Sequence, residues 1–431
     1  AKAGVLLSDS SALKSEFSSA LVTLLESHKP SHIALAVSGG GDSMALMVLA
    51  AEWCHSQGVR CSVITIDHDL RAGSAGEAIF VARQAEKLGL SHRVGRWHER
   101  VDGGNLQQKA RVARYRLIDE MREGADVVLM AHTLEDQAET VLMRLRRPAG
   151  IDGLAGIPQK RRVFSEQDDF WLLRPLLKSS GVRLRAFLNE QAVDWVEDPS
   201  NSDRKYERVR MRQHLSELAR QGITAQDLSN IAAKMAKSKM QLDAQVHQVA
   251  EMLTEEYSGD LRLRLSAFCG LPSLLQKRLF SKALCWVSAN PYPPRQAARD
   301  QALDLLLLGK AQTLHGCMMF LWKNCLYITR EAQAIAAQPV ALQPKMLWDK
   351  RWRLTMSQAL ASDALWVAAL GPTEAAKLRP HLDIDLPFKA LVAQPAIFNQ
   401  TGFLCAPALR PHSGLQAQIW PRDFIESLRP Y

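Results

Sequence analysis

The sequence predicts an α/β protein with a Rossmann-like parallel sheet covered by helices on both faces, followed by a helical domain and a small mixed, β-rich C-terminal domain. Short apolar runs alternate with helix-forming stretches from residue 31 to about 195, which is typical of βαβ units. Periodic apolar residues from 210 to about 310 indicate an all-helical unit, and the prolines and short apolar runs after 345 favour strands. A chain of 431 residues is long for one domain. We expect domains at 1–212, 213–335 and 345–431, with a linker at 338–344.

The first of these domains is expected to hold four parallel strands. The strands are predicted over 33–37, 60–66, 92–97 and 126–130. The helices between and after them are predicted over 43–57, 75–88, 105–122 and 135–147. Ligands of such sheets bind at the carboxyl ends of the strands, and polar residues follow three of the strands, at 38–43, 67–69 and 132. We therefore expect the functional site at this edge of the sheet.

A glycine-rich loop joins the first strand to the first helix of the sheet. It consists of Ser38, Gly39, Gly40, Gly41, Asp42 and Ser43. Free backbone N–H groups at a helix N-terminus bind phosphate, and an aspartate there can hold Mg²⁺ on a pyrophosphate. No Gly-Lys-Ser/Thr ends the loop, so it is not a Walker A loop. An ordinary tight turn is the alternative, and the flanking strand and helix favour the phosphate site.

Carboxylates open the helix that follows His132. Glu135 begins this helix, and Asp136 and Glu139 are three residues apart, so they share one helical face. Carboxylates beside a triphosphate can hold Mg²⁺ or accept a proton. A solvated acidic first turn, favoured by the helix dipole, is the alternative. The neighbouring glycine loop favours the functional interpretation.

Basic residues and one histidine complete the candidate site. His68 follows the second strand and contacts a nucleotide in one interpretation, or is structural in the other. Arg111 and Arg114 lie three residues apart and can clamp a phosphate, with a basic helix surface as the alternative. Two further basic stretches, at 144–162 with a flexible glycine-rich loop and at 206–212, suit an RNA backbone or a solvated charged face equally well.

Composition limits the class of protein. The net charge of +9 favours a polyanionic partner. Seven cysteines form no C-x-x-C pair, which argues against a zinc knuckle, an iron–sulfur centre or a redox pair and favours buried thiols in a reducing compartment. No apolar run approaches the length of a membrane span, and the first 14 residues have no secretory h-region. We expect a cytoplasmic protein with no membrane partner, and the sequence leaves open whether it is a monomer or a homodimer.

Together these motifs resemble the tRNA(Ile)-lysidine synthetase family of N-type ATP pyrophosphatases, or PP-loop enzymes, in its long form. The similar segments are 38–43, 68–71, 104–115, 132–140, 153–157, 174–177 and 198–201. The resemblance is dense over 31–212, and the order of the motifs is specific to the family. Three residues depart from the family pattern: Asp69 replaces a glycine, Glu135 an aspartate and Val209 an asparagine.

The resemblance implies ATP-dependent ligation of free L-lysine to the wobble cytidine of the CAU anticodon of tRNA(Ile). ATP adenylates the cytidine and releases pyrophosphate, then lysine displaces AMP and forms lysidine. The resemblance implies ATP and Mg²⁺ as cofactors, and tRNA binding by the middle and C-terminal domains. It also implies roles for residues of this chain. Asp42 and Asp136 would bind magnesium, His132 and Glu139 would bind substrate, and Glu139 with Asp136 would accept the proton of lysine. Arg111 and Arg114 would stabilise the activated intermediate, and Arg208 and Arg212 would bind RNA or phosphate.

Two alternatives stay open at this point. The first is another tRNA-modifying PP-loop enzyme of the thiolase type, which would need paired cysteines, whereas Cys54 and Cys61 are far apart for a C-x-x-C pair. The second is a non-catalytic nucleotide- or RNA-binding relative. The presence of Asp42, Asp136 and Glu139 argues against it.

Overall fold

The computed structural model forms two compact units, Ala1–Lys239 and Met240–Pro430. The structure describes residues 9–67, 74–97, 106–146, 150–165, 168–197, 207–360, 364–383 and 385–429, with the backbone alone at 74–75, 106–112 and 207–209. No helix in these ranges is both long enough and apolar enough to cross a membrane. The three-domain division expected from the sequence stays a prediction.

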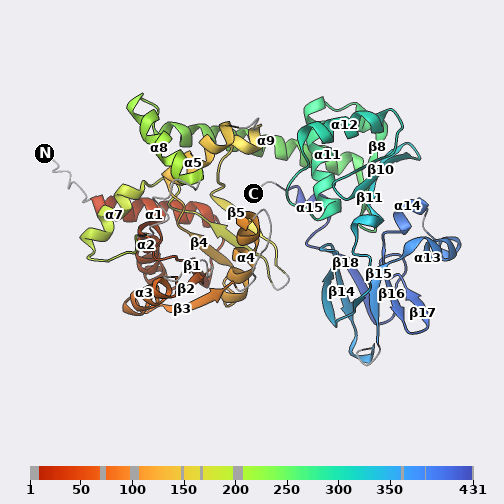
Figure 1. Cartoon of the computed structure of the whole chain (residues 1–431), viewed down its shortest axis with the longest axis horizontal. Coiled ribbons are helices and arrows are strands. Elements are labelled where there is room, and N and C mark those ends of the chain that lie inside the picture. The colour runs from red at the N-terminus through yellow and green to blue at the C-terminus, as the bar shows by residue number, and fades with distance from the viewer. Residues whose placement is uncertain are drawn as a thin grey trace. The chain divides into compact units, whose positions relative to one another are not determined.

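A six-stranded sheet forms the centre of the first unit (Figure 1). Its spatial order is β3 (Ser91–Arg96), β2 (Arg60–Asp67), β1 (His32–Ala36), β4 (Val127–Met130), β6 (Phe170–Leu173) and β5 (Lys160–Val163). All neighbours pair in parallel except β5 and β6, which are antiparallel at the edge. The four predicted strands are confirmed within about two residues. The basic stretch at 144–162 was expected to be irregular, and this is wrong for its last three residues, because they begin β5.

Helices cover both faces of this sheet, as predicted. Alternate side chains of a strand point to opposite faces. Ile33 and Leu35 therefore lie in one core with helices α1 (Asp9–Leu25), α2 (Gly41–Gln57), α3 (Ser74–Lys87) and α7 (Gly181–Glu190). Ala34 lies in the opposite core with Ile118 of α4 (Leu106–Met121). The apolar runs of the strands are buried on both sides for this reason.

Two further helices of the first unit pack on each other and on the part of a third that lies before Met240. They are α5 (Leu134–Leu145), α8 (Glu207–Arg220) and α9 (Ala225–Leu253). Ala138 and Val141 of α5 share a buried cluster with Leu215 of α8 and with Leu228 and Ala232 of α9. This packing places α8 against the helix that begins just after β4 and His132.

The second unit contains a five-stranded sheet in a region where the sequence predicts only helices. The spatial order is β7 (Thr254–Tyr257), β8 (Asp260–Arg264), β11 (Cys325–Arg330), β10 (Cys317–Trp322) and β9 (Gln312–Leu314). Helices α10 (Leu265–Cys269), α11 (Ser273–Ser288) and α12 (Gln296–Leu307) confirm the helical region, and α11 and α12 fill the core on one face of the sheet.

The hairpin between β7 and β8 interrupts the expected all-helical unit. Its turn residues Ser258 and Gly259 have φ values of 47° and 76°. Positive φ at both central residues is the geometry of a two-residue hairpin loop. A Cβ at Gly259 would lie 2.7 Å from Ile419 Cδ1 and 2.8 Å from Trp352 Cζ2, so only glycine fits. The Ser-Gly pair was the signal that the helical periodicity concealed.

Two smaller sheets follow and confirm the β-rich C-terminal region. One contains β12 (Val340–Ala341), β15 (Trp366–Ala369), β16 (Pro395–Asn399) and β17 (Gly402–Cys405), and the other β13 (Lys345–Trp348), β14 (Trp352–Met356) and β18 (Leu415–Ile419). They share a core that includes Trp352 and Val367. The expected linker at 338–344 thus contains a strand, because β12 pairs with β15.

Short helices complete the second unit. Side chains around α13 (Gly371–Leu378) and α14 (Phe388–Leu391) share a core with Phe320 and Tyr327 of the five-stranded sheet. Phe424 of α15 (Phe424–Ser427) is fully buried in the core on the sheet's other face. Its N–H donates to Glu256 Oε2 at 2.9 Å. The end of the described chain therefore packs beside the start of the second unit.

A buried ionic cluster lies next to the β7–β8 turn. Asp260 and Arg351 are 1% and 3% exposed, and Arg351 donates a hydrogen bond to the Gly259 carbonyl. Tyr327 donates to Asp260 Oδ2 at 3.2 Å. Burial raises the pKa of Asp260 to about 7, and the charge of Arg351 opposes that shift. Arg351 thus offsets the cost of a carboxylate in an apolar core.

Candidate active site

The glycine loop leaves β1 and enters α2 through a turn braced by serines. Gly39 has φ +90°, a conformation that favours glycine. The Ser43 hydroxyl donates to the Gly40 carbonyl at 2.8 Å and accepts from the Ser38 N–H at 3.2 Å. Gly40 supplies no side-chain cap, so the first N–H groups of α2 point out of the helix end without an intrahelical acceptor. The loop has the geometry of an anion cradle.

Other parts of the first unit approach this loop closely. The Val196 N–H donates to the Gly39 carbonyl at 2.9 Å. A Cβ at Gly41 would lie 3.3 Å from Arg185 Cγ on α7 and 3.5 Å from Trp195 Cδ1. A side chain at position 41 would therefore crowd both residues, and glycine keeps the helix end accessible.

Asp42 lies in the first turn of α2 and has charged side chains of both signs near its carboxylate. Its Oδ1 is buried and makes no hydrogen bond with any described atom. Burial raises the pKa of Asp42 to about 6; Arg185 lowers it, while Asp136 and Glu135 raise it. These carboxylates from two helices therefore lie within electrostatic reach of one another. A buried, unpartnered carboxylate oxygen with anionic neighbours suits a cation.

Glu135 and Asp136 each cap a helix. The Asp136 carboxylate accepts the Thr133 N–H at 2.9 Å, which forms a capping box at the start of α5. Glu135 Oε2 accepts the Gly181 N–H, in the first turn of α7, at 3.0 Å. A Cβ at Gly181 would lie 3.1 Å from Asp42 Oδ1. The first turns of α2, α5 and α7 thus converge on one acidic group, and the departure at Glu135 has a structural role.

Glu139 joins α5 to α8 through an ion pair. Its side chain is 0% exposed and accepts from Arg212 Nε at 2.8 Å, while the Arg212 side chain is 50% exposed. Burial alone would lower the pKa of Arg212, but the hydrogen bond and the charge of Glu139 raise it above its usual value. A buried carboxylate thus has a half-exposed cationic partner.

His132 follows β4 and is held by a buried arginine. Arg174 is 0% exposed and donates from Nε to His132 Nδ1 at 3.2 Å and from Nη1 to the Pro158 carbonyl at 2.7 Å. Because Nδ1 accepts, a neutral His132 carries its proton on Nε2. That nitrogen is then a hydrogen-bond donor.

The remaining predicted residues are not brought into this group. His68 lies outside the described residues. Arg111 lies on α4 and Arg208 on α8, and their side chains are outside the described part. Arg114 is half-buried on α4, on the face of the sheet opposite α2. Their predicted roles stay predictions.

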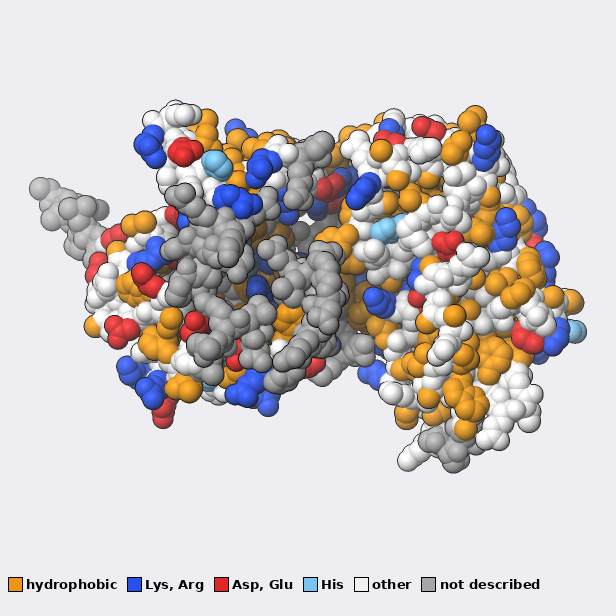
Figure 2. Space-filling model, in the orientation of Figure 1, with side chains coloured by type: hydrophobic (Ala, Val, Ile, Leu, Met, Phe, Trp, Pro, Cys, Tyr) orange, Lys and Arg blue, Asp and Glu red, His pale blue; other side chains and the backbone are white. Residues whose placement is uncertain are grey.

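Several cations of the basic stretch at 144–162 have partners within the first unit. Arg144 donates to the Gly153 carbonyl at 2.6 Å. Lys160 lies 4.5 Å from the centre of the Trp171 ring, and Arg162 pairs with Asp169 at 3.2 Å. On the face drawn in Figure 2, Lys and Arg side chains are visible along both the upper and the lower edge of the first unit.

A glutamine on α5 fixes the loop that precedes β5. Gln137 donates from Nε2 to the Ile157 carbonyl at 3.1 Å and accepts the Ile157 N–H at 2.6 Å. Gly156 has φ +67°, and a Cβ there would lie 2.4 Å from Gln137 Oε1. The Gly153–Ile157 motif therefore braces the helix that carries Asp136 and Glu139.

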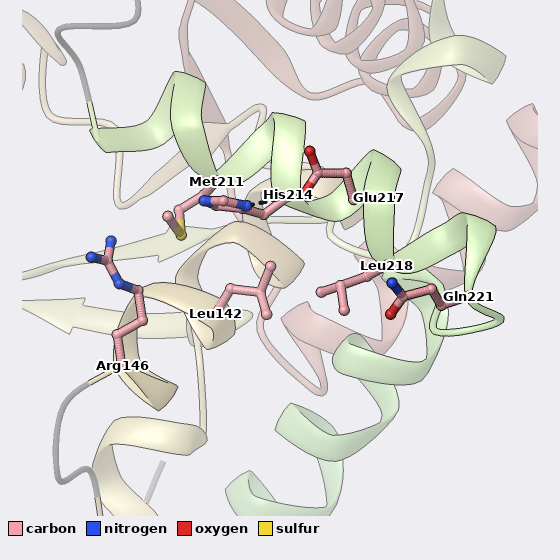
Figure 3. Close-up of a pocket in the computed structure, with 7 residues that line it drawn as sticks. All are labelled: Leu142, Arg146, Met211, His214, Glu217, Leu218 and Gln221. Carbon is pink, nitrogen blue, oxygen red and sulfur yellow. Dashed lines mark hydrogen bonds and ion pairs between the residues drawn. The ribbon is translucent and has the colours of Figure 1, made fainter.

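A pocket of about 320 Å³ is lined by side chains of α5 and α8 (Figure 3). It is lined by Leu142 and Arg146 of α5 and by Met211, His214, Glu217, Leu218 and Gln221 of α8. Leu142 lies one turn beyond Glu139 on α5, and Met211 precedes Arg212. The lining thus includes sequence neighbours of Glu139 and Arg212 but no residue of the glycine loop.

Sequence reasoning missed two arginines of this site. Arg174 lies in the 174–177 motif, where only its contact with His132 reveals a role. Arg185 had no sequence signal, since it is one of several charged residues on α7. Within the described ranges, no three His, Cys, Asp or Glu side chains are arranged as a ligand set for a metal.

Comparisons with known proteins agree with this geometry. Residues 13–219 match the model of a PP-loop domain. The tRNA(Ile)-lysidine synthase of Ruegeria pomeroyi is 38% identical over 93% of this chain and 94% of its own. Proteins of that name from Rhodopseudomonas palustris and Mesorhizobium japonicum are 40% and 32% identical, over 58% and 87% of this chain and 73% and 84% of theirs. The chain belongs to the tRNA(Ile)-lysidine synthase family.

Proposed function

We propose that this protein uses ATP to attach free L-lysine to the wobble cytidine of the CAU anticodon of tRNA(Ile), forming lysidine. The observation that carries the proposal is the convergence of the glycine loop, Asp42, Glu135 and Asp136 at the carboxyl edge of the sheet. The family's relatives favour this reaction over a thiolase-like one. We infer a cytoplasmic setting from the reaction, since its substrates are cytoplasmic.

The first step would be adenylation of the cytidine. The O2 oxygen of cytosine attacks the α-phosphorus of ATP, and the bond to pyrophosphate breaks. The N–H groups around Gly40 and Gly41 would bind the departing phosphates. The buried Oδ1 of Asp42 fits a cation, so Asp42 and Asp136 would hold Mg²⁺, which supplies positive charge to pyrophosphate when bound.

The second step would be displacement of AMP by lysine. The ε-ammonium of lysine first loses a proton, and the resulting amine nitrogen attacks C2 of the cytosine. The bond from C2 to the AMP oxygen then breaks, and the nitrogen loses its second proton. Glu139 is suited to bind the lysine ammonium because it already holds one cation, Arg212, at 2.8 Å. We infer that lysine takes the place of Arg212, whose half-exposed side chain would turn to RNA, and that Glu139 with Asp136 accepts the proton.

The other polar residues would position the RNA. His132 presents Nε2–H as a donor, and Arg208 on the same helix as Arg212 would bind phosphate. Arg111 and Arg114 would stabilise the adenylated intermediate. The middle and C-terminal regions would bind the rest of the tRNA, and the target base must leave its stack to reach the site.

Incubation with Mg²⁺, ATP, radiolabelled lysine and bulk bacterial tRNA tests the proposal. We expect ATP-dependent label on RNA that resists mild alkali, which cleaves an aminoacyl ester. Absence of label with tRNA-dependent release of pyrophosphate would refute lysine as the nucleophile. Full turnover of an Asp136→Asn variant would refute the assignment of Asp136, with wild-type protein prepared alongside as the control.

A further inference from the structure

Arg185 occupies an unusual electrostatic position on α7. It lies one turn beyond Gly181, and its Cγ would be 3.3 Å and its Nε 3.6 Å from a Cβ built at Gly41. The side chain therefore crosses the N-terminal end of α2. Its Nη1 would be 3.4 Å from a Cβ built at Gly181, at the start of its own helix. The guanidinium thus lies near the positive ends of two helix dipoles.

A cation is disfavoured in such a place unless an anion is near. Cations are stabilised at helix C-termini and destabilised at N-termini. Asp42 is near enough for its charge and that of Arg185 to interact. No hydrogen bond or ion pair joins the Arg185 guanidinium to a side chain or carbonyl of the described chain, so its five N–H donors are available. The residue is also exposed and can reach a bound ligand.

The loop beside Arg185 lacks the cation that other phosphate loops carry. A Walker A loop ends in a lysine that reaches the terminal phosphates. Here Asp42 and Ser43 stand after the glycines. A guanidinium from a neighbouring helix can supply the same positive charge and can bind two phosphate oxygens at once.

We propose that Arg185 binds the β- and γ-phosphates of ATP, and then the pyrophosphate formed from them, at the N-terminus of α2. This inference rests on the proposed function in taking ATP as the substrate, but the phosphate contact itself does not depend on lysine or tRNA. Arg185 holds the leaving group against the Gly40 and Gly41 amides while the α-phosphorus is attacked. It is a substrate-binding residue for the adenylation step.

Two measurements on the full-length protein test this role. The first is calorimetric titration with magnesium pyrophosphate, which requires no turnover. We expect Arg185→Gln to weaken binding about tenfold or more, as loss of hydrogen bonds to a charged group does, and Arg185→Lys to recover part of it. Arg183→Gln is the matched control, because Arg183 lies on the same helix but pairs with Asp9 at 2.8 Å. It should bind pyrophosphate like the wild type.

The second measurement separates phosphate binding from a general effect on the site. In Arg185→Gln we expect the inhibition constant for pyrophosphate and the KM for ATP to rise together, while inhibition by AMP changes less than twofold. Equal losses for pyrophosphate and AMP, or unchanged pyrophosphate binding, would overturn the inference. A change confined to the KM for tRNA would overturn it too, since Arg185 would then contact RNA. Arg185-dependent pyrophosphate binding without lysidine formation would sustain it and refute the proposed function alone.

Discussion

Gly156→Ala should destabilise the first unit and loosen the helix that carries the carboxylates. Gly156 has φ +67°, and the added methyl would lie 2.4 Å from Gln137 Oε1. Gln137 cannot yield without losing its two hydrogen bonds to Ile157, at 2.6 and 3.1 Å. Both a backbone cost and a hydrogen-bond cost therefore follow from one methyl group.

Two contributions set the expected loss of stability in Gly156→Ala. A residue other than glycine in the left-handed region costs about 1–2 kcal/mol. Loss of two hydrogen bonds at a buried glutamine costs about 1–2 kcal/mol more. We expect a total of about 2–4 kcal/mol in the free energy of unfolding. Gly150→Ala is the control, because Gly150 has φ −77° and a Cβ there would meet no atom within 4 Å, so a change under about 0.5 kcal/mol is expected.

Urea unfolding of the full chain, followed by hydrogen exchange of α5 and α6 (Ile151–Leu154), measures both effects. Exchange in α5 should accelerate in Gly156→Ala and stay unchanged in Gly150→Ala. If the free energy of unfolding of Gly156→Ala lay within about 0.5 kcal/mol of the wild-type value, the clash with Gln137 would not require glycine at position 156, and the prediction would be refuted.

Three other predictions concern charged groups. Burial raises the pKa of Asp42 from 3.8 to about 6, so the folded protein holds this proton more tightly than the unfolded chain, and the cost of ionising Asp42 builds up between these two pH values and is complete above the higher one. Without Mg²⁺, Asp42→Asn should therefore raise Tm most at pH 8, by about half as much at pH 5 and hardly at all near pH 3.5, while abolishing turnover; an equal shift at pH 8 and near pH 3.5 would contradict this. Glu139→Gln should raise the KM for lysine at least tenfold in the labelling assay, and unchanged lysine affinity would rule out its role. Arg351→Met should cost the second unit about 3 kcal/mol or more in thermal unfolding, because it leaves Asp260 buried without a cationic neighbour, whereas half-exposed Arg353→Met should change little.

The sequence was most informative where local signals and tertiary packing agree. Buried parallel strands are continuous apolar runs, so β1, β2 and β4 and the helices beside them could be predicted within two residues. β5 could not, because Lys160, Arg161 and Arg162 form an edge strand whose apolar contacts come from the side-chain stems and from Trp171. The β7–β8 hairpin was missed because its apolar residues also fit a helical period.

The candidate site could be predicted in its parts but not in its contacts. Ser38–Ser43 and the carboxylates stood out because they follow strand ends. That Glu135 caps α7, that Arg212 holds Glu139, and that Arg185 crosses the end of α2 all depend on residues separated by at least 46 positions. Such pairings depend on how helices pack against one another. The spacing of residues along a single helix does not predict that packing.

Phe424 is buried among residues of the five-stranded sheet and α11, so the C-terminal part of the second unit packs into the core formed by its N-terminal part. A protease that cut the exposed stretch at 336–339 would leave Phe424 and Leu428 in that core and the Phe424 N–H on Glu256. The two fragments would therefore elute as one particle from a sizing column and separate only in denaturant. Neither fragment has a complete interior without the other, so the two would have to be produced together to fold.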